Sequence, residues 1–491
     1  MARIDMGVFQ PKEFVSRRIT GDTQFMFQFY KPCIQYFKPS SLVSSHMSEA
    51  KLRQSLVRAL HGCPLLFGQF NIHSDLSISL DYDPQDSNPP TLEFQRVSVG
   101  YAQLQAQNFA YSAATRYGLD IAIPDGTIRK RKSQELDSML PLLMVKVSYL
   151  SDGGVALFSM TNHVAFDGNA MFSFIAHWAK CNRSLLGAQG AVVDLPSDLE
   201  SYAESVVTNT GKPLVPGPVE ISVDATRTPS EISVANSKSV ASADGMQACV
   251  FAIPTRNLQQ LKTRVEESVV VGAAAAAATN QQRVSSNSVL TAFIAQCVAR
   301  ANTESQVYET GSWTVFQALD MRRPLGLAQR GLGSPLILAE CQATNTEITA
   351  GEGLEELARR VRKSVDKYSG EYCQAAMDWM NQSYVDLAQS GVVEPWRHFW
   401  FSALNTNRRA VGVSCMNRIP IYEADFGAGR PAMARSFNPR PNYVIVFPGP
   451  PTSSTGEYEC LHMYVTLERP AMDALRSDPE WTKQCSLVSE S

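Results

Sequence analysis

The stretch LLMVKVSYLSDGGVALFSMTNHVAFDGNAMFSFIAHW, residues 142–178, decides the fold of this chain. Two runs rich in Leu, Val, Met and Phe, at 142–147 and 155–160, flank the sequence Ser-Asp-Gly-Gly, and this arrangement predicts a β-hairpin. A helical repeat of apolar residues follows and predicts a buried helix. The residues of that repeat are Met171, Phe174, Ile175 and Trp178. The chain therefore turns from a strand into a helix near residue 163, and polar side chains at this junction are candidates for chemistry.

The rest of the chain has strand and helix patterns on both sides of one long segment without periodicity. Residues 191–245 are rich in Ser, Ala, Val and Pro, which predicts a linker between a first lobe at 1–190 and a second at 246–491. The pattern at 287–301 predicts a strongly amphipathic helix. The alanine-rich run near 272–282 predicts a surface insertion. The remaining expected elements are helices at 48–61 and 470–476 and strands at 314–319, 442–447 and 460–467. Interspersed strands and helices predict two mixed α/β lobes.

Composition excludes several classes of protein. The 491 residues carry 44 Lys and Arg against 47 Asp and Glu, a net charge of −3, which argues against binding to nucleic acid. The first twenty residues lack the apolar core of a signal peptide, and the longest run without polar residues, 269–278, is too short for a membrane span. The ten Cys are scattered and form no metal-binding pair. We therefore expect a cytosolic protein with a reduced interior, no metal and no membrane span.

The sequence TNHVAFDG at 161–168 is the sharpest candidate for a catalytic site. Of the seven His in the chain, only His163 is followed four residues later by an Asp. An imidazole with an ordinary pKa of about 6.5 is a natural general base near neutral pH. Asp167 either orients that ring or locks the turn by pairing with a cation elsewhere. The competing interpretation is that His163 only caps a strand, and the pattern around His177 and His398 indicates structural roles.

A second unusual sequence, IYEADFGAGRP at 421–431, places two glycines around one small residue and ends in proline. This pattern predicts a tight loop. A dinucleotide-binding site is rejected because a helix cannot open cleanly at Arg430-Pro431. No Gly-x-Ser-x-Gly sequence exists, and no Cys is adjacent to a His. Covalent catalysis therefore has no support in the sequence, and a purely structural role for this loop stays open.

The two sequences, in this order and 262 residues apart from His163 to Asp425, resemble the HxxxDG and DFGWG motifs of the BAHD-type acyltransferases, which depend on coenzyme A. The resemblance covers nearly the whole chain, including 52–70 and 319–325, and the tail at 458–485 is similar to that of fungal trichothecene O-acetyltransferases. It implies an α/β (α+β) fold of two chloramphenicol-acetyltransferase-like lobes. Each lobe is expected to be a mixed sheet with flanking helices, and the two to face each other across a solvent channel.

The resemblance also implies roles for individual residues. His163 is implied to be the general base, and Asp167 to point away from the substrate and pair with Arg322. Ser414 takes the place of a family element that contacts the oxyanion or coenzyme A, although Ser-Cys-Met stands here for the Thr-Ser-Trp of plant members. The distal motif, in which Ala428 replaces the family Trp, is implied to hold the shape of the coenzyme channel. The structural residues of the two motifs are Gly168, Asp425, Phe426, Gly427 and Gly429.

The implied function is transfer of an acyl group, acetyl by analogy, from an acyl-CoA co-substrate to the hydroxyl of a hydrophobic secondary metabolite. Both substrates are expected to meet in a ternary complex within a monomeric, cytoplasmic, fungal-type enzyme that holds no permanent cofactor. Three alternatives stay open: an N-acyltransferase, a condensation-type enzyme, and a catalytically degenerate lobe pair that only binds a ligand or a partner. Condensation enzymes normally have two adjacent His before xxxDG, and Asn162 fills the first of those positions here.

Overall fold

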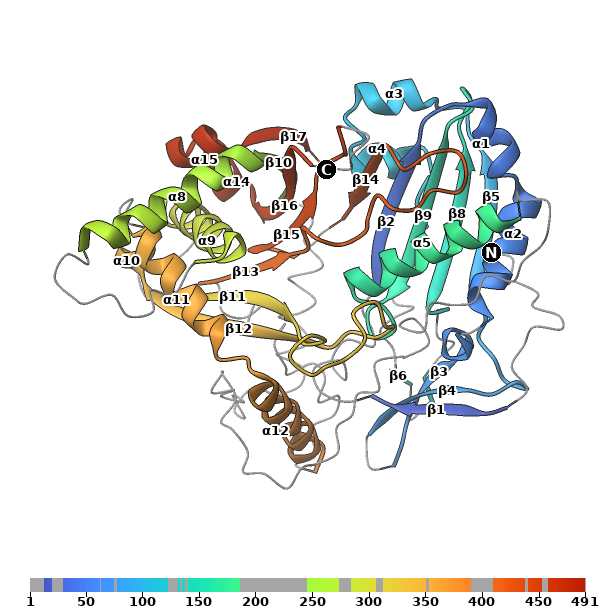
Figure 1. Ribbon diagram of the computed structural model, residues 1–491, viewed down its shortest axis with the longest axis horizontal. Coiled ribbons are helices and arrows are strands. Elements are labelled where there is room, and N and C mark those ends of the chain that lie inside the picture. Colours follow the sequence, from blue (N-terminus) through green and yellow to red (C-terminus); the bar gives the residue numbers. More distant parts are fainter. Residues whose placement is uncertain are drawn as a thin grey trace.

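Two β-sheets with helices packed on them form the body of the protein (Figure 1). We describe them from a computed structural model of the chain. The residues that it describes are 13–19, 30–61, 63–74, 77–121, 131–132, 135–136, 140–185, 245–272, 284–305, 312–349, 353–389, 409–437, 440–452 and 458–490. The expected linker at 191–245 lies outside these residues except for its last position, and so does most of the alanine-rich run.

The first sheet contains the predicted hairpin. Its strands are β2 (Tyr30–Phe37), β5 (Thr91–Arg96), β8 (Leu143–Tyr149), β9 (Val155–Asn162) and β14 (Met433–Ser436), in the order β14-β2-β9-β8-β5. β9 pairs antiparallel with both β8 and β2, whereas β5 runs parallel to β8. Gly153, with a φ of 88°, lies in the tight turn between β8 and β9. The hairpin prediction is confirmed.

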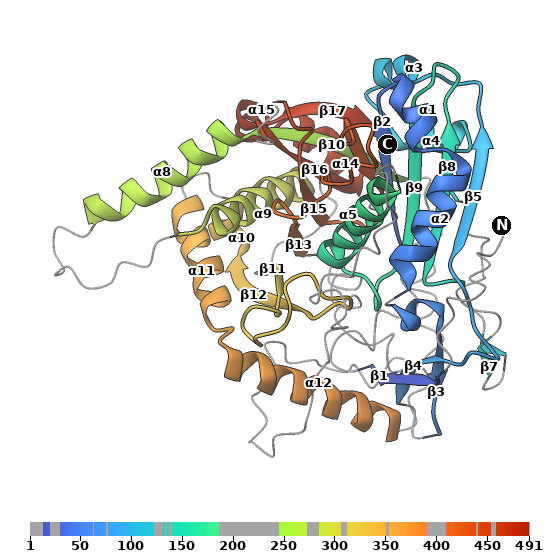
Figure 2. The same cartoon turned by 45° about the vertical axis from the view of Figure 1, so that its right-hand side comes forward.

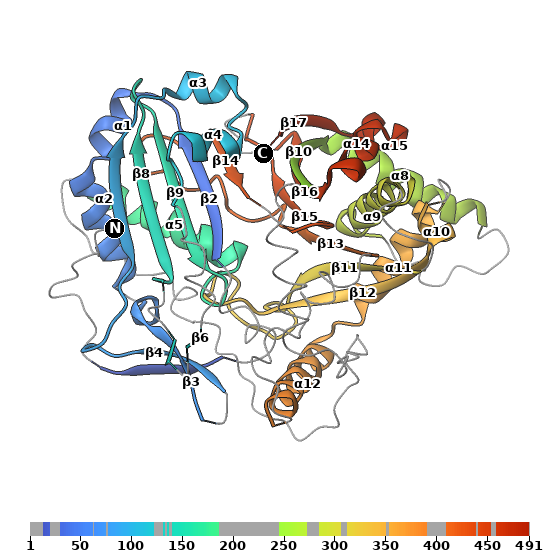
Figure 3. The ribbon, with the colours of Figure 1, turned by 180° about the vertical axis from the view of Figure 1, so that it is seen from behind.

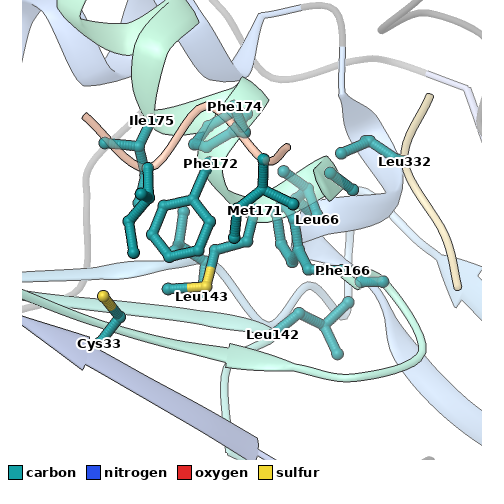
Figure 4. Close-up of a cluster of buried hydrophobic side chains, with 14 of the residues drawn as sticks. Cys33, Leu66, Leu142, Leu143, Phe166, Met171, Phe172, Phe174, Ile175 and Leu332 are labelled. Atoms are coloured by element: carbon teal, nitrogen blue, oxygen red, sulfur yellow. The ribbon is translucent and has the colours of Figure 1, made fainter. Parts of the chain in front are cut away.

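Both faces of this sheet are buried, because alternate side chains of each strand point to opposite sides. Cys33 and Phe37 of β2 and Leu157 of β9 pack in one core with α2 (Glu49–Leu60) and α5 (Gly168–Ser184). Figure 4 shows part of this core at the start of α5, with Leu142, Leu143, Phe166, Met171 and Phe172 among its labelled side chains. The residues of the predicted repeat are buried, and α5 also buries most of its other residues.

The other face of the first sheet carries a second core. Ile34 of β2 and Phe158 of β9 pack there with α3 (Tyr101–Ala106) and α4 (Tyr111–Arg116). A smaller sheet lies below, in the order β1-β4-β3, and the sequence analysis did not predict it. The bounds of the short elements are β1 (Val15–Arg18), α1 (Ser41–His46), η3 (Pro64–Phe67), β3 (Gln69–Ile72), β4 (Ile78–Tyr82), β6 (Arg131–Lys132) and β7 (Glu135–Leu136).

The second sheet is built from the second half of the chain in the order β12-β11-β13-β15-β16-β10-β17. Its strands are β10 (Met246–Pro254), β11 (Ser312–Asp320), β12 (Leu336–Thr344), β13 (Ala410–Cys415), β15 (Tyr443–Pro448), β16 (Cys460–Glu468) and β17 (Ser486–Glu490). The sheet is mixed, since β13 runs parallel to both of its neighbours and the other pairs are antiparallel. The strands predicted at 314–319, 442–447 and 460–467 are all present.

Helices cover the second sheet. They are α8 (Thr255–Gly272), α9 (Ser286–Glu304), α10 (Asn345–Thr349), α11 (Leu354–Asp366), α14 (Arg469–Ser477) and α15 (Pro479–Gln484), and α12 (Gly370–Gln389) extends away below them (Figure 2). The prediction of a strongly amphipathic helix at 287–301 is wrong in one respect. Nearly every residue from Ser288 to Asn302 is buried, because α9 is enclosed by α8, α10, α11, α14 and the sheet. A helix surrounded in this way needs no polar face.

Two segments of the second half connect the two sheets. β14 pairs antiparallel with β2, with Met433 opposite Tyr36, and so extends the first sheet (Figure 3). The loop after β11 reaches the end of β9, where Phe166 and Gly333 form a parallel bridge. The fold is therefore a mixed α/β fold, as expected, whose two sheets are joined next to His163.

Candidate active site

His163 follows the last residue of β9, and its side chain is 3% exposed. The ring is thus nearly enclosed. It is less exposed than we expected for a ring that lies in a solvent channel between two lobes. Its Nδ1 lies 3.0 Å from the Ser334 hydroxyl. No hydrogen bond to Nε2 occurs among the described residues. A neutral imidazole with its proton on Nδ1 carries on Nε2 the lone pair that a general base needs.

The environment of His163 keeps the imidazole neutral. Burial lowers the pKa of His163 well below its ordinary value, and the positive charges of Lys31 and Arg440 lower it further. A cationic ring is disfavoured in such a site because it would lose its hydration and face two like charges. At neutral pH the side chain is therefore an unprotonated base.

The Asp167 carboxylate has no contact with the ring among the interactions of the described residues. One oxygen accepts a hydrogen bond of 2.8 Å from the Ala170 amide and so caps the N-terminus of α5. The other oxygen forms an ion pair with the Arg322 guanidinium. Of the two roles that the sequence left open, the geometry matches the pairing with a distant cation. The ion pair that the family resemblance implies is present.

Arg322 is fully buried and holds several groups at once. Besides Asp167, its guanidinium donates to the Asp320 carboxylate and to the carbonyls of Gly331 and Gly333, each at 3.0 Å. Burial alone would lower the pKa of Arg322, but the two carboxylates raise it. The guanidinium therefore stays charged and ties the start of α5 to the loop after β11.

That loop, with the sequence Gly-Leu-Gly-Ser at 331–334, contains the residue that the sequence analysis missed. The Gly333 amide donates to the Ala165 carbonyl at 2.8 Å, and the Gly333 carbonyl accepts from the Asp167 amide at 3.1 Å. Its φ of 104° suits only glycine. Ser334 comes next and is 2% exposed, with its hydroxyl at His163. The available signal was a run of small residues directly after the Asp-x-Arg strand.

The distal motif forms the predicted tight loop. One oxygen of Asp425 accepts from the amides of Gly427, at 2.8 Å, and Gly429, at 3.0 Å. Both glycines have a φ of 95°, in the region that other residues rarely adopt. Phe426 is fully buried and makes an edge contact with Trp178 of α5. The loop thus packs on the helix that begins at the HxxxDG motif.

The asparagine at the far end of α5 strengthens this contact. The side-chain amide of Asn182 donates to the Phe426 carbonyl at 2.8 Å and to the His46 carbonyl at 2.9 Å. The His46 ring in turn donates from Nδ1 to the Gly427 carbonyl at 2.6 Å. These contacts fix the distal loop through its backbone, and the described contacts of its side chains do not include His163.

Ser414 lies on β13, is half-buried, and hydrogen-bonds the phenol of Tyr443. Two residues later, the thioether of Met416 fills the space where a side chain on Gly168 would stand. The end of β13 therefore reaches the start of α5, next to Asp167. No hydrogen bond between Ser414 and His163 occurs among the described residues.

The other candidate residues of the sequence, His177 and the cysteines, have structural surroundings. His177 is buried in α5 beside the Cys181 thiol, and burial lowers the pKa of His177 to about 4. His398 lies outside the described residues. All ten Cys are free thiols. Within the described part of the chain, no group of His, Cys, Asp or Glu is arranged to hold a metal ion, and no helix has the length and apolar character that crossing a membrane requires.

The site thus has an imidazole at a strand–helix junction and, four residues later, an Asp that is turned away from it into a buried ion pair. The model of the Transferase family matches residues 123–482. The chain belongs to this family, the BAHD-type acyltransferases, and is an acyltransferase that depends on acyl-CoA.

Curated relatives are similar over different shares of their length. A hydroxycinnamoyltransferase of Narcissus pseudonarcissus is 25% identical over 418 residues, 82% of each chain. A hydroxycinnamoyl-CoA:5-hydroxyanthranilate N-hydroxycinnamoyltransferase of Avena sativa is 27% identical over 299 residues, 60% of this chain and 59% of that protein. The O-acetyltransferase ptmV of Penicillium ochrochloron is 21% identical over 388 residues, 71% of this chain and 73% of that one.

Solved structures share the fold at low identity. TRI101 of F. sporotrichioides, complexed with Coenzyme A and T-2, has a TM-score of 0.72 and 16% identity, covering 97% of this chain and 100% of that chain. Vinorine synthase has a TM-score of 0.61 and 18% identity, covering 97% and 95%. A condensation domain of the calcium-dependent antibiotic synthetase has a TM-score of 0.53 and 13% identity, covering 96% and 98%. These likenesses concern the fold.

Proposed function

We propose that this enzyme transfers an acetyl group from acetyl-CoA to a hydroxyl of a hydrophobic small molecule, with His163 as the general base. The observation that carries the proposal is the environment of His163, a buried ring whose Nδ1 lies 3.0 Å from the Ser334 hydroxyl and whose pKa is lowered by burial. With the proton on Nδ1, Nε2 is the basic nitrogen. The O-acetyltransferase among the relatives supports a hydroxyl acceptor by its name.

The reaction proceeds in a ternary complex without an acyl-enzyme. Nε2 of His163 takes the proton of the acceptor hydroxyl while the oxygen attacks the thioester carbonyl. The tetrahedral intermediate then expels the thiolate as the carbon–sulfur bond breaks, and the imidazolium returns the proton to sulfur. The products are an ester and free coenzyme A, and the base is regenerated. General base assistance of this kind contributes about 10²–10⁴-fold to the rate.

The oxyanion of the intermediate requires hydrogen-bond donors. Ser414 is one candidate, since its strand reaches the start of α5 at Gly168. The remaining parts of the proposal follow the family resemblance. The two substrates enter by opposite ends of a solvent channel between lobes at 1–190 and 246–491, which the linker at 191–245 joins. Asp425, Phe426, Gly427 and Gly429 keep that channel in shape, and the enzyme works as a cytoplasmic monomer of fungal-type secondary metabolism.

The test is an assay of the purified protein with acetyl-CoA and a panel of polycyclic alcohols, with released thiol and ester product as readouts. We expect thiol release that depends on the alcohol and falls about 10²–10⁴-fold in His163→Ala. His177→Gln is the matched control, because it replaces another buried His of the same region and should keep its activity. Acyl transfer that survives His163→Ala unchanged overturns the mechanism.

The same assay separates the alternatives. Transfer to amines but to no alcohol indicates an N-acyltransferase, the activity that the name of the Avena sativa relative gives for that protein. Transfer from carrier-bound substrates alone indicates a condensation-type enzyme, although Asn162 in place of the first His argues against it. Binding without any turnover indicates a degenerate lobe pair, for which His163→Ala has no activity to remove.

A further inference from the structure

A lysine lies on the strand next to the catalytic histidine. Lys31 of β2 is directly opposite Thr161 of β9 in the antiparallel register. Directly opposite residues of such a pair project from the same face of the sheet, and so do residues two apart on one strand. Lys31, Thr161 and, beyond the strand end, His163 are therefore arranged along one face. Lys31 is half-buried on this face.

A second cation from the other half of the chain joins this lysine. Arg440, just before β15, acts with its charge on both Lys31 and His163. Burial lowers the pKa of Lys31 to about 7, and the neighbouring Arg440 adds to that effect, while Asp167 opposes it. The charges of two basic side chains, one on β2 and one in the loop before β15, thus act on one imidazole, and their mutual repulsion is a cost to the folded protein.

The buried arginines Arg322 and Arg435 and the partly buried Arg300 have side-chain partners close by. Arg322 pairs with Asp167, Arg300 pairs with Asp478 at 2.8 Å, and Arg435 donates to His462 Nδ1 at 3.0 Å. The Lys31 ammonium has no ion pair or hydrogen bond within the described residues. Asp167, the acid whose charge acts on it, already uses one oxygen for Arg322 and the other for the Ala170 amide. The negative charge that would balance Lys31 is therefore not supplied by a neighbouring carboxylate.

A polar atom on the residue opposite Lys31 also lacks a hydrogen-bond partner among the described residues. The Thr161 hydroxyl is buried, in a residue that is 1% exposed, and has no hydrogen-bond partner among the residues that the structure describes. Buried hydroxyls ordinarily have a partner, because leaving one unpaired costs stability. An unpaired hydroxyl beside an unpaired ammonium is what a bound anion with two oxygens would complete.

We propose that Lys31, together with Arg440 and Thr161, binds a carboxylate of a substrate that reacts at His163. The inference rests on the proposed function and adds to it the class of the substrate, a hydroxy acid in place of an uncharged alcohol. One carboxylate oxygen pairs with the ammonium and the guanidinium, and the other accepts from the Thr161 hydroxyl. Charge-assisted bonds of this kind are the strong ones in proteins.

The experiment compares hydroxy acids with their methyl esters as acceptors for acetyl-CoA, using cholic acid with methyl cholate and quinic acid with methyl quinate. We expect at least one acid to exceed its ester in kcat/KM by about ten- to a hundredfold, the value of a hydrogen bond to a charged group. Lys31→Met should abolish that preference, whatever it does to the rate with the ester, and Lys31→Arg should retain it.

Two controls test whether the loss of preference for the acid is specific to Lys31. Lys146→Met is the matched variant, since Lys146 is a half-buried lysine of the same sheet whose ammonium donates to the Asp120 carbonyl at 2.9 Å. It should keep the preference for the acid. An equal loss with acid and ester in Lys31→Met overturns the inference, because it assigns Lys31 to the oxyanion or to folding. The absence of any preference in the wild type also overturns it.

A donor arm and a binding arm complete the design. Malonyl-CoA is compared with acetyl-CoA on an uncharged alcohol, and a preference for malonyl-CoA that Lys31→Met removes assigns the carboxylate to the acyl group. Calorimetry with the CoA-saturated protein measures binding of each acid and ester without turnover. Acids that bind better than esters only when Lys31 is present support the inference even if no product forms, whereas the proposed function then fails by itself.

Discussion

At the scale of single residues, the two nitrogens of His163 have different tasks. Nδ1 is 3.0 Å from the Ser334 hydroxyl, and Nε2 lies on the other side of the ring. We therefore propose that Ser334 positions the ring of the proposed base.

Ser334→Ala removes the hydroxyl that lies 3.0 Å from Nδ1 of His163. We expect kcat to fall about five- to tenfold with little change in KM, because a neutral hydrogen bond contributes about 1 kcal/mol and the imidazolium loses part of its stabilisation. Steady-state kinetics of the variant measures both constants. A rise in KM at constant kcat would contradict the positioning role.

The sequence predicted one side of this site and not the other. The spacing of His163 and Asp167 was readable because both lie on a single turn between a strand and a helix. Ser334 is 171 residues away and Lys31 lies on another strand, so their approach depends on how the sheets are joined. A single sequence carries no local pattern for such contacts.

At the scale of elements, the start of α5 is the junction of the molecule. Asp167 caps the helix through the Ala170 amide and pairs with Arg322, which in turn holds the carbonyls of Gly331 and Gly333. One carboxylate thus connects β9, α5 and the loop after β11. The loop brings Ser334 to His163, so the ion pair acts on the base through the loop.

Asp167→Asn retains an oxygen for the helix cap and removes the charge. We expect the free energy of unfolding to fall by about 3–5 kcal/mol, because Arg322 keeps a buried charge with less compensation, and activity to fall with it. Chemical denaturation and kinetics measure the two effects. Asp320→Asn is the control: its carboxylate contacts the same guanidinium but is 39% exposed, so the loss should be smaller. Lost turnover at unchanged stability would instead assign Asp167 a direct catalytic role.

Element prediction succeeded where strong local signals bounded an element. The Gly-Gly turn between two apolar runs marked the β8–β9 hairpin, and the apolar repeat after Asp167 marked α5. α9 is different, because sheet and helices enclose it, and its few polar residues gave a false impression of an exposed face. The sequence pattern of a helix does not show how many other elements will pack against it.

At the scale of the whole molecule, three buried histidines couple stability to pH. Burial lowers the pKa of His163 well below 6.5, that of His177 to about 4 and that of His462 to about 3. The Arg435 guanidinium donates to His462 Nδ1 at 3.0 Å, which only a neutral ring can accept. In the unfolded chain these rings bind protons near pH 6.5. Their contribution to stability is complete above that pH and is lost as the pH falls toward the folded values.

The free energy of unfolding should therefore decrease as the pH falls from 6.5 toward 4.5, by about 1.4 kcal/mol per pH unit for each histidine that stays neutral in the folded state. His462→Gln should make this slope shallower by about 1.4 kcal/mol per pH unit, the contribution of one proton, whatever it does to stability at pH 7.5. Urea denaturation at a series of pH values measures the slope. A stability independent of pH between 4.5 and 6.5 would contradict the burial of these neutral rings.

The exchange of segments between the two halves is also a whole-molecule property that sequence reasoning did not reach. Four residues of β14 complete the first sheet although they come from the second half of the chain. Their alternation is too short to show which sheet they join. The resemblance to a family supplied the fold class, and local periodicity supplied the elements within it.

The most direct test of the central claim is the pH dependence of kcat/KM for acetyl transfer, measured beside His163→Ala. A neutral His163 predicts full activity down to pH 6.5, an acidic limb with its midpoint well below that value, and a loss of about 10²–10⁴-fold in the variant. A midpoint at or above pH 6.5 that persists in His163→Ala, or a variant that retains wild-type turnover, would contradict the assignment of His163 as the base.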